Sequence, residues 1–157
     1  MKRFIWFGLG IIFLLLIAGS TLYVFARASL AEDVKRVETI VLQEEDVQAV
    51  MDVDYYHGKE VVYSAIVQTD QNELERLFVR DEQVVTRISL EETLTEEEAM
   101  SLVRGRFQID DIKSIHAGIE NGTPLYQLTF EKDNRLHFYY LDMRDGTFIK
   151  RYSMMMD

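Results

Sequence analysis

The pattern of apolar and polar residues divides the chain into one long apolar run, a short amphipathic segment and a series of alternating segments. The run from Phe4 to Ala26 contains no charged residue. As a helix rising about 1.5 Å per residue, it is long enough to cross a hydrocarbon core of roughly 30 Å. Lys2 and Arg3 precede it, and positive flanks favour the cytoplasmic side of a membrane. We therefore predict that residues 1–27 are a cytoplasmic flank and a single-pass anchor, with the remainder extracytoplasmic.

A cleaved secretory signal is the alternative for this run. Ala26, Arg27 and Ala28 have the small-x-small form of a cleavage site. The apolar run is longer than a usual signal core of about 7–15 residues, which favours a retained anchor. In both cases the rest of the chain is exported.

Residues 28–43 have the period of an amphipathic helix. The apolar positions recur three or four residues apart: Leu30, Val34, Val37 and Val41. No Gly or Pro separates this segment from the apolar run. We expect that the anchor and this helix can form one continuous rod.

The period then changes to the two-residue alternation of β-strands. Four strands are predicted between residues 50 and 90, and four more between residues 112 and 155. Asn121-Gly122 is the strongest short hairpin signal in the sequence. Between the two sets, Thr95 and Glu98 have the spacing of a capping box. This spacing predicts a helix that begins after Thr95 and ends near Gly105 or Phe107.

The order of predicted elements repeats. Residues 28–90 and residues 91–157 each contain one helix followed by four strands. Similar sequence segments support the repeat. For example, Gly58 and the VVYSAIVQTDQ segment after it correspond to Gly122 and the LYQLTFEKDN segment after it. The predicted fold class is α+β, with a transmembrane helix followed by two tandem units that each pack one helix on an antiparallel sheet. Because the linker from residue 89 to residue 94 is short, we expect the two units to pack together.

Composition narrows the possible functions. The formal net charge is −10, which argues against a nucleic-acid partner because phosphate binding needs a basic surface. The chain has no Cys, so disulfides, thiolate chemistry and attachment to lipid through a cysteine are excluded. About 130 exported residues suffice for one ordinary domain or two small ones.

We find no pattern that predicts catalysis or ligand binding. The three histidines, His57, His116 and His137, lack metal-ligand spacing. The carboxylate pairs Asp52/Asp54 and Asp110/Asp111 accompany no nucleophile-and-base set. No phosphate-binding or dinucleotide-binding loop is present. We therefore predict no catalytic residue, no metal, no cofactor and no small-molecule substrate.

The strand over residues 135–143 carries large apolar side chains on both faces. We expect one face to pack against the helix that follows Thr95. The other face either packs on the first unit or is exposed for a partner. The candidate partner surface consists of aromatic residues on predicted strands: Tyr55, Tyr56, Phe138 and Tyr140. The terminal Met154-Met155-Met156 run adds adaptable side chains of the kind found at interfaces.

A family resemblance rests on the second repeat, residues 112–152. Its GIENG-x-PLYQLTF and FYYLDMRDGTFIKRY segments resemble the TseB-like cell-wall elongation regulators (YpmB family) of Bacillus-type Firmicutes, which are related to PepSY modules. The resemblance covers nearly the whole chain and is looser in the first repeat. Where this chain has Tyr126, the family more often has Trp.

This resemblance implies a single-pass membrane protein with two cystatin-like, PepSY-type units and no enzyme activity of its own. It also implies interaction with a class B penicillin-binding transpeptidase of the elongation machinery. The expected function is therefore a membrane-anchored, extracytoplasmic regulator of cell-wall elongation. Two alternatives stay open: a PepSY-type modulator or inhibitor of a secreted or membrane peptidase, and direct binding of cell-wall glycan.

Overall fold

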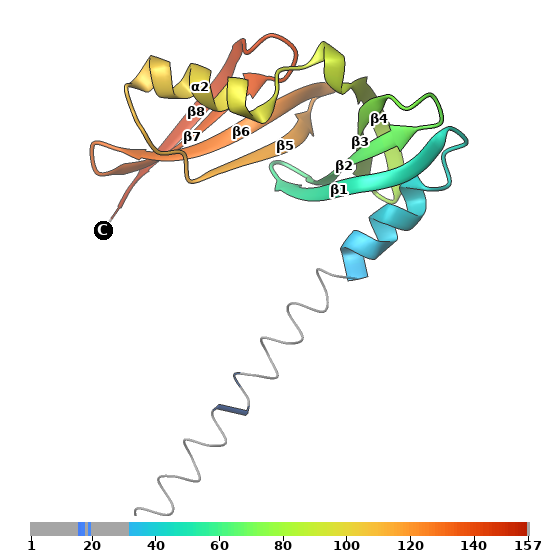
Figure 1. Cartoon of the computed structure of the whole chain (residues 1–157). Helices are drawn as coiled ribbons and strands as arrows, with labels where there is room; N and C mark the ends of the chain where they lie inside the picture. Colours follow the sequence, from blue (N-terminus) through green and yellow to red (C-terminus); the bar gives the residue numbers. More distant parts are fainter. Residues whose placement is uncertain (1–15, 18, 20–31, 157) are drawn as a thin grey trace, which may run out of the picture. The chain divides into compact units, whose positions relative to one another are not determined.

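The computed structural model of the chain describes residues 16–17, 19 and 32–156 (Figure 1). The chain divides into two compact units, residues 1–36 and residues 37–157. The predicted anchor from Phe4 to Ala26 lies almost entirely outside the described residues, and so does the beginning of the predicted amphipathic helix. Within the described part, no helix has both the length and the apolar character needed to cross a membrane.

The first sheet contains four antiparallel strands in the order of the sequence. They are β1 (Val47–His57), β2 (Val61–Thr69), β3 (Leu74–Arg80) and β4 (Gln83–Ser89). Residues 32–41 before them are helical. In this segment the buried Val37 and Val41 form one apolar cluster with Ala65, Val67 and Leu77 of the sheet. One helix and four strands are therefore present where the sequence pattern predicts them.

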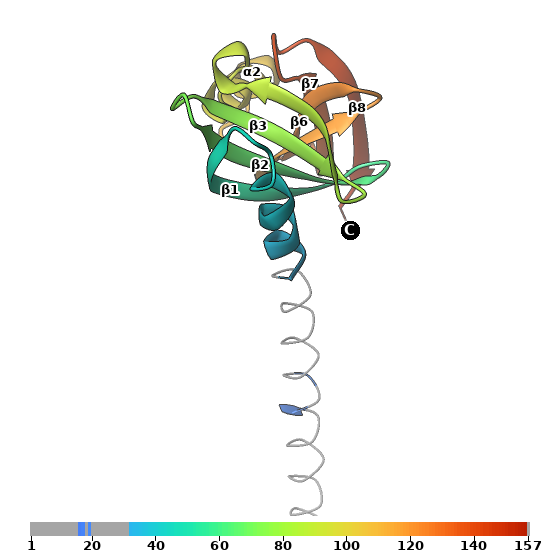
Figure 2. The ribbon, with the colours of Figure 1, turned by 90° about the vertical axis from the view of Figure 1, so that its right-hand side faces the viewer.

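The second sheet repeats this arrangement. A short 3-10 helix, η1 (Leu90–Glu92), leads to α2 (Glu96–Phe107). Four antiparallel strands follow in sequence order: β5 (Ser114–Glu120), β6 (Thr123–Lys132), β7 (Arg135–Asp142) and β8 (Phe148–Met155). Figure 2 shows the two sheets from a second direction. The predicted α+β class is confirmed.

Local signals in the sequence account for both ends of α2 and for the hairpin that follows β5. The Glu98 amide donates to Thr95 Oγ1 (3.2 Å), and the Thr95 amide donates to Glu98 Oε2 (2.8 Å), so the predicted capping box is confirmed. The helix ends at Phe107, where Gln108 adopts a left-handed conformation (φ 53°). Asn121 and Gly122 both have positive φ, 50° and 80°, as their hairpin turn requires.

Two details differ from the sequence prediction. The linker from residue 89 to residue 94 contains η1, because the Ser89 hydroxyl accepts from the Glu91 amide and caps a single turn. Strand β1 begins at Val47 and not near residue 50. Its start is held by Asp46, whose carboxylate accepts two hydrogen bonds from the Arg87 guanidinium on β4 (2.7 and 2.9 Å). Asp46 and Arg87 are far apart in sequence, so the local sequence pattern could not predict that their pairing extends β1 to Val47.

Both faces of the first sheet contribute buried side chains to an apolar cluster. One face packs with Val37, Ile40 and Val41. The opposite face supplies Tyr56, Val62, Phe78 and Ile88 to a cluster whose other members come from α2 and the second sheet. The two sheets therefore share a hydrophobic core.

The ring of Tyr56 is the centre of the joint between the sheets. Tyr56 lies on β1, is 1% exposed and packs on the backbone of Gly118 in β5. A Cβ at position 118 would overlap this ring, and a Cβ at Gly58 would come within 2.5 Å of it. A glycine inside a strand often marks such a close approach. Gly118 is thus required by packing between the sheets.

A buried arginine forms a second part of the joint. Arg76 on β3 is 3% exposed and lies over the Tyr126 ring of β6, with its guanidinium carbon 5.7 Å from the ring centroid. The same guanidinium donates to the Ser64 hydroxyl (3.3 Å) and pairs with the Glu96 carboxylate at the start of α2 (3.5 Å). The charge of Arg76 is therefore neutralised by a residue of the second half.

Replacing Gly118 tests the joint directly. We expect Gly118→Ala to lower the free energy of unfolding by about 1–3 kcal/mol, because the Tyr56 ring must move away from the new methyl group. Gly105→Ala is the matched control, since a Cβ there has nothing within 4 Å. In an exposed helical position this control should be neutral or stabilising by up to about 1 kcal/mol. Urea unfolding followed by circular dichroism measures both, and equal stability of the two variants would contradict the packing described.

Candidate interaction surface

The structure separates the four aromatic residues of the candidate partner surface. Tyr56 and Tyr140 are buried, at 1% and 7% exposure, and belong to the core that the two sheets share. They are therefore part of the joint and are not available on the surface. Tyr55 is 36% exposed but lies on the other face of β1, beside Tyr63 (5.3 Å between ring centroids). Phe138 is half-buried and packs at the margin of the shared core.

A charged pair connects the joint with strand β8. The Tyr56 hydroxyl donates to Glu120 Oε1 (2.7 Å), and the Lys150 ammonium pairs with the same carboxylate. Lys150 also lies over the Tyr140 ring, 4.3 Å from its centroid. These contacts hold β8 in place although it lies at the edge of the sheet.

The joint shifts the pKa values of its ionisable groups. Burial, and then the hydrogen bond to Glu120, raise the pKa of Tyr56 far above its usual value. Burial also raises the pKa values of Tyr126 and Tyr140. For Glu120 burial opposes ionisation, but hydrogen bonds from Lys150 and Tyr56 outweigh it and lower the pKa of the carboxyl. The joint thus favours neutral tyrosines and an ionised Glu120.

Strand β8 is the most exposed strand described. It pairs with β7 alone, and all of its side chains except Lys150 are exposed. Tyr152 is 57% exposed and Met155 is 73% exposed. The other exposed large apolar residues of the strand are Phe148, Ile149 and Met154. So much apolar surface on one edge strand is unusual for a protein without a partner at that site.

Exposed and partly buried apolar side chains on one face of the second sheet form a patch. Tyr139 packs on Phe107 of α2 (5.1 Å between ring centroids), so its neighbour Phe138 points to the opposite face. The register pairs Leu136 with Met154 and Phe138 with Tyr152. We call these four residues, Leu136, Phe138, Tyr152 and Met154, the apolar patch. Of the predicted surface residues, only Phe138 belongs to it.

The face of β8 toward α2 contains a groove of about 510 Å³, which we call the arginine groove. Its residues are Arg106, Tyr139, Phe148 and Arg151. Arg106 donates to the Tyr139 hydroxyl, and Arg151 lies over the Phe107 ring with its guanidinium carbon 5.7 Å from the centroid. Two cations are therefore held against aromatic rings at the margin of β8.

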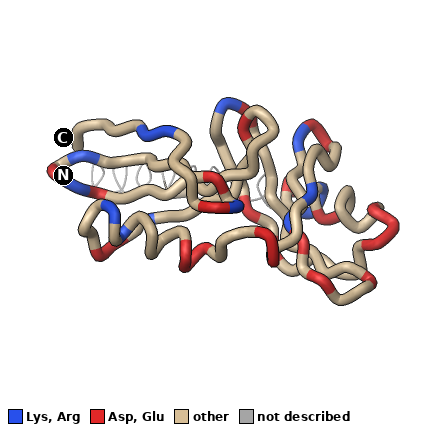
Figure 3. Tube along the Cα trace, turned by 90° about the horizontal axis from the view of Figure 1, so that it is seen from above, with Lys and Arg blue, Asp and Glu red and all other residues tan. Residues whose placement is uncertain are grey.

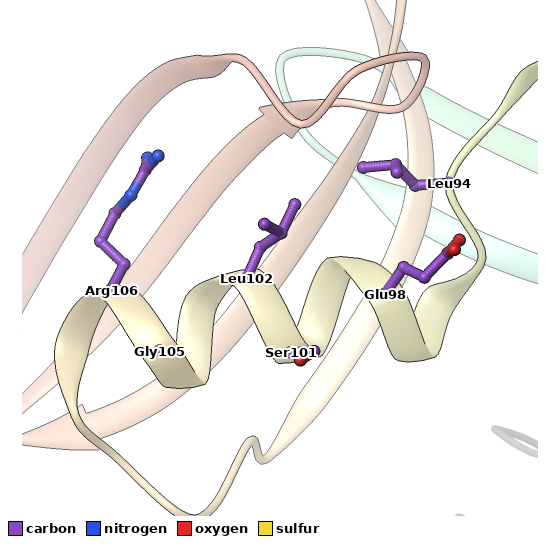
Figure 4. Close-up of a pocket in the computed structure, with 6 residues that line it drawn as sticks. All are labelled: Leu94, Glu98, Ser101, Leu102, Gly105 and Arg106. Atoms are coloured by element: carbon purple, nitrogen blue, oxygen red, sulfur yellow. The ribbon is translucent and has the colours of Figure 1, made fainter.

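A second shallow groove of about 460 Å³ continues along α2 and shares Arg106 with the first. Figure 4 shows Leu102 and Arg106 on the side of α2 that faces the hairpin between β7 and β8, with Leu94 beside them. Gly146 of that hairpin lies against Leu102 and Leu94, with φ +71°. These contacts fix the hairpin, and thereby the beginning of β8, against the helix.

The histidines and paired carboxylates do not gather into a reactive centre. His116 lies 3.2 Å from the Asp54 carboxylate, across the joint. His137 stacks on Phe130, with 5.1 Å between ring centroids. Among the described residues, no group of three or more His, Cys, Asp or Glu side chains is placed to hold a metal ion.

Sequence reasoning missed Tyr152, Phe148 and the two arginines of the groove. A signal for the strand was available, because the last strand of a four-stranded meander must lie at an edge. The apolar character of both faces of β8 was also visible. No local signal brings Arg106 to Arg151, because they lie on different elements and meet only when α2 packs on the sheet.

The described chain is thus an α+β protein of two packed four-stranded sheets with an exposed edge on the second. Neither a comparison with protein families nor one with curated proteins finds a match. Among solved structures, the YpmB protein from Bacillus subtilis superimposes with a TM-score of 0.68 at 18% identity, over 76% of this chain and 96% of that one. A candidate lipoprotein from Clostridium difficile 630 has a TM-score of 0.41 at 15% identity, over 70% of this chain and 84% of that one. The chain has a YpmB-like fold.

The shifted tyrosines predict a loss of stability at alkaline pH. Because folding raises the pKa of Tyr56, its contribution is fully present below the unfolded pKa of about 10 and is lost as the pH rises above that value. We expect the free energy of unfolding to fall between pH 10 and pH 11.5, by up to about 1.4 kcal/mol per pH unit for each such tyrosine.

Tyr56→Phe should make this slope shallower, because the titrating hydroxyl is gone. At pH 8 it should cost about 1 kcal/mol for the lost hydrogen bond to Glu120. Urea unfolding at several pH values measures both effects. If the free energy of unfolding of Tyr56→Phe falls above pH 10 as steeply as that of the unmodified chain, the Tyr56 hydroxyl is not the cause of the alkaline loss of stability.

Proposed function

We propose that this chain is a membrane-anchored, extracytoplasmic regulator of cell-wall elongation that acts by binding a class B penicillin-binding transpeptidase. In this proposal residues 1–27 form the anchor, and the two halves are tandem cystatin-like, PepSY-type units. The identity of the partner comes from the family resemblance of residues 112–152. The YpmB-like fold agrees with that resemblance at the level of structure.

The single observation that carries a binding function is the exposed apolar surface of β8. Tyr and Met are enriched at protein interfaces, where their large side chains lose water on binding. The apolar patch contains both, at Tyr152 and Met154, which are 57% and 55% exposed. The strand beneath them is held by the pair of Lys150 with Glu120. The surface is therefore apolar and also preorganised, which lowers the entropic cost of binding.

The two alternative functions predict different partners for the same surface. A modulator of a peptidase would present the apolar patch to that enzyme. A glycan-binding protein would stack sugars on its exposed aromatic rings. We favour a protein partner because the patch combines an aromatic pair, Phe138 with Tyr152, and an aliphatic pair, Leu136 with Met154, on two neighbouring strands.

Photocrosslinking in living cells identifies the partner. We expect p-benzoylphenylalanine at position 152 or 154 of the full-length chain to capture the transpeptidase. The control is position 85, because Val85 is exposed (37%) on β4, the edge strand of the other sheet. Capture of a peptidase at 152 and 154 would replace the transpeptidase with the first alternative. No transpeptidase crosslink at either position would contradict the proposed function.

A pair of tyrosine variants tests the surface itself. Tyr152→Ser should weaken co-purification with the transpeptidase by roughly tenfold or more, as expected for an aromatic anchor at an interface. Tyr55→Ser is the matched control, because Tyr55 is the exposed tyrosine of the first sheet. Both side chains are exposed, so both variants should fold, which circular dichroism checks. If Tyr55→Ser abolishes binding and Tyr152→Ser does not, the partner contacts the first sheet.

A further inference from the structure

The two sheets have four edge strands, and three of them are protected. Strand β1 contains two register shifts, and β5 lies beside it across the joint. Strand β4 has an extra residue, Val85, where its pairing with β3 shifts. Such bulges and coverings prevent an edge from pairing with another strand. Strand β8 is regular from Lys150 to Met155 after an early shift at Ile149, so its edge is open.

The outward-facing backbone groups of β8 follow from its pairing with β7. The Met156 amide donates to the Asn134 carbonyl (3.2 Å), so it points toward β7. Residues of an antiparallel strand alternate between pointing to the partner strand and away from it. The amides of Arg151, Ser153 and Met155 therefore face away from β7. At this edge the Arg135 guanidinium donates to the Ser153 carbonyl (3.3 Å), which adds a positive charge to it.

The side chains of β8 carry no negative charge, although the whole chain has a formal net charge of −10. Strand β8 contains Lys150 and Arg151 and no acidic residue, and in Figure 3 the segment leading to the C-terminus is blue in part and nowhere red. Within residues 32–156, Arg106 and Arg151 contact aromatic rings and form no ion pair. Their charges remain available to a carboxylate.

These observations separate the possible occupants of the edge. A second copy pairing through β8 would bring the unpaired Arg106 and Arg151 of each copy toward the same cations, which is unfavourable, whereas Lys150 is already paired with Glu120. An acidic strand would place its carboxylates where positive charge is unpaired. Charge complementarity therefore favours an acidic segment from another protein over self-association.

We propose that β8 binds an extended acidic segment of a partner protein, which adds a fifth strand to the second sheet. Its backbone pairs with Arg151, Ser153 and Met155. Because strand side chains alternate between faces, its acidic residues enter the arginine groove between Arg106 and Arg151. Its apolar residues then lie on Tyr152 and Met154. The recognised pattern is alternating apolar and acidic residues, and only the identity of the partner rests on the proposed function.

A proline substitution tests the backbone pairing. The probe is a fluorescein-labelled octapeptide of alternating Val and Glu, and its binding to the purified full-length chain is followed by fluorescence anisotropy at about 0.15 M salt. We expect Ser153→Pro to weaken binding at least tenfold. Its missing N–H faces away from β7, so no backbone bond within the sheet is lost. The hydrogen bonds that Arg135 donates to the Ser153 hydroxyl are lost in Ser153→Pro and in Ser153→Ala alike. Ser153→Ala keeps the N–H and should bind within twofold of the unmodified chain.

A charge reversal tests whether the arginine groove binds the acidic residues of the peptide. This test does not require that Ser153→Pro folds. Arg106→Glu combined with Arg151→Glu should weaken the Val–Glu peptide about tenfold or more. Lys59→Glu combined with Arg80→Glu changes the net charge equally, at exposed or partly exposed positions in the first half that do not line the arginine groove. This control should change binding less than twofold, because the local charge of the groove, and not the net charge, is expected to decide binding at this salt concentration. A Val–Lys peptide should not bind measurably.

The outcomes separate this inference from the proposed function. Equal binding of the Val–Glu and Val–Lys peptides, or unchanged binding in both the folded Ser153→Pro variant and the double arginine variant, overturns the inference. Crosslinks from position 152 to the transpeptidase would then still support the proposed function. Selective binding of the Val–Glu peptide that both changes weaken supports the inference, even where no transpeptidase is captured in cells.

Discussion

The packing of Tyr56 on Gly118 joins the two sheets, and the exposed edge depends on it. The ring occupies the space that a side chain at position 118 would fill. Its hydroxyl holds Glu120, and Glu120 pairs with Lys150 of β8. A contact between the first sheet and β5 is therefore transmitted across the second sheet to its last strand. Removing the ring would leave a cavity and would also leave the partly buried Glu120 with fewer partners.

Periodicity was sufficient to predict most of the secondary structure. The capping box at Thr95, the Asn121-Gly122 turn and the two sets of four strands depend on contacts between near neighbours in sequence. The burial of Tyr56 depends on its contact with Gly118, which is far away in sequence. The alternation of the strand alone therefore led to the prediction that Tyr56 is a surface residue. Tyr140 was misplaced for the same reason, because its strand is apolar on both faces and only the packing of the sheets distinguishes buried from exposed positions.

The surface of β8 combines features that usually occur apart. An exposed apolar edge promotes aggregation unless charge, a bulge or a partner protects it. The unpaired Arg106 and Arg151 disfavour pairing between copies, and the same cations are complementary to an acidic partner. Protection of the free chain and selection of a partner can therefore come from the same residues. This arrangement suits a chain whose β8 edge is free until it binds the proposed partner.

Residue-resolved hydrogen exchange of the β8 amides tests most directly whether this edge is the site of binding. In the free chain the Tyr152 and Met154 amides should be protected by β7, whereas those of Arg151, Ser153 and Met155 should exchange rapidly. Addition of the transpeptidase should slow exchange at Arg151, Ser153 and Met155. Unchanged exchange at these three amides in the complex, with new protection on β4 or elsewhere, would contradict the account.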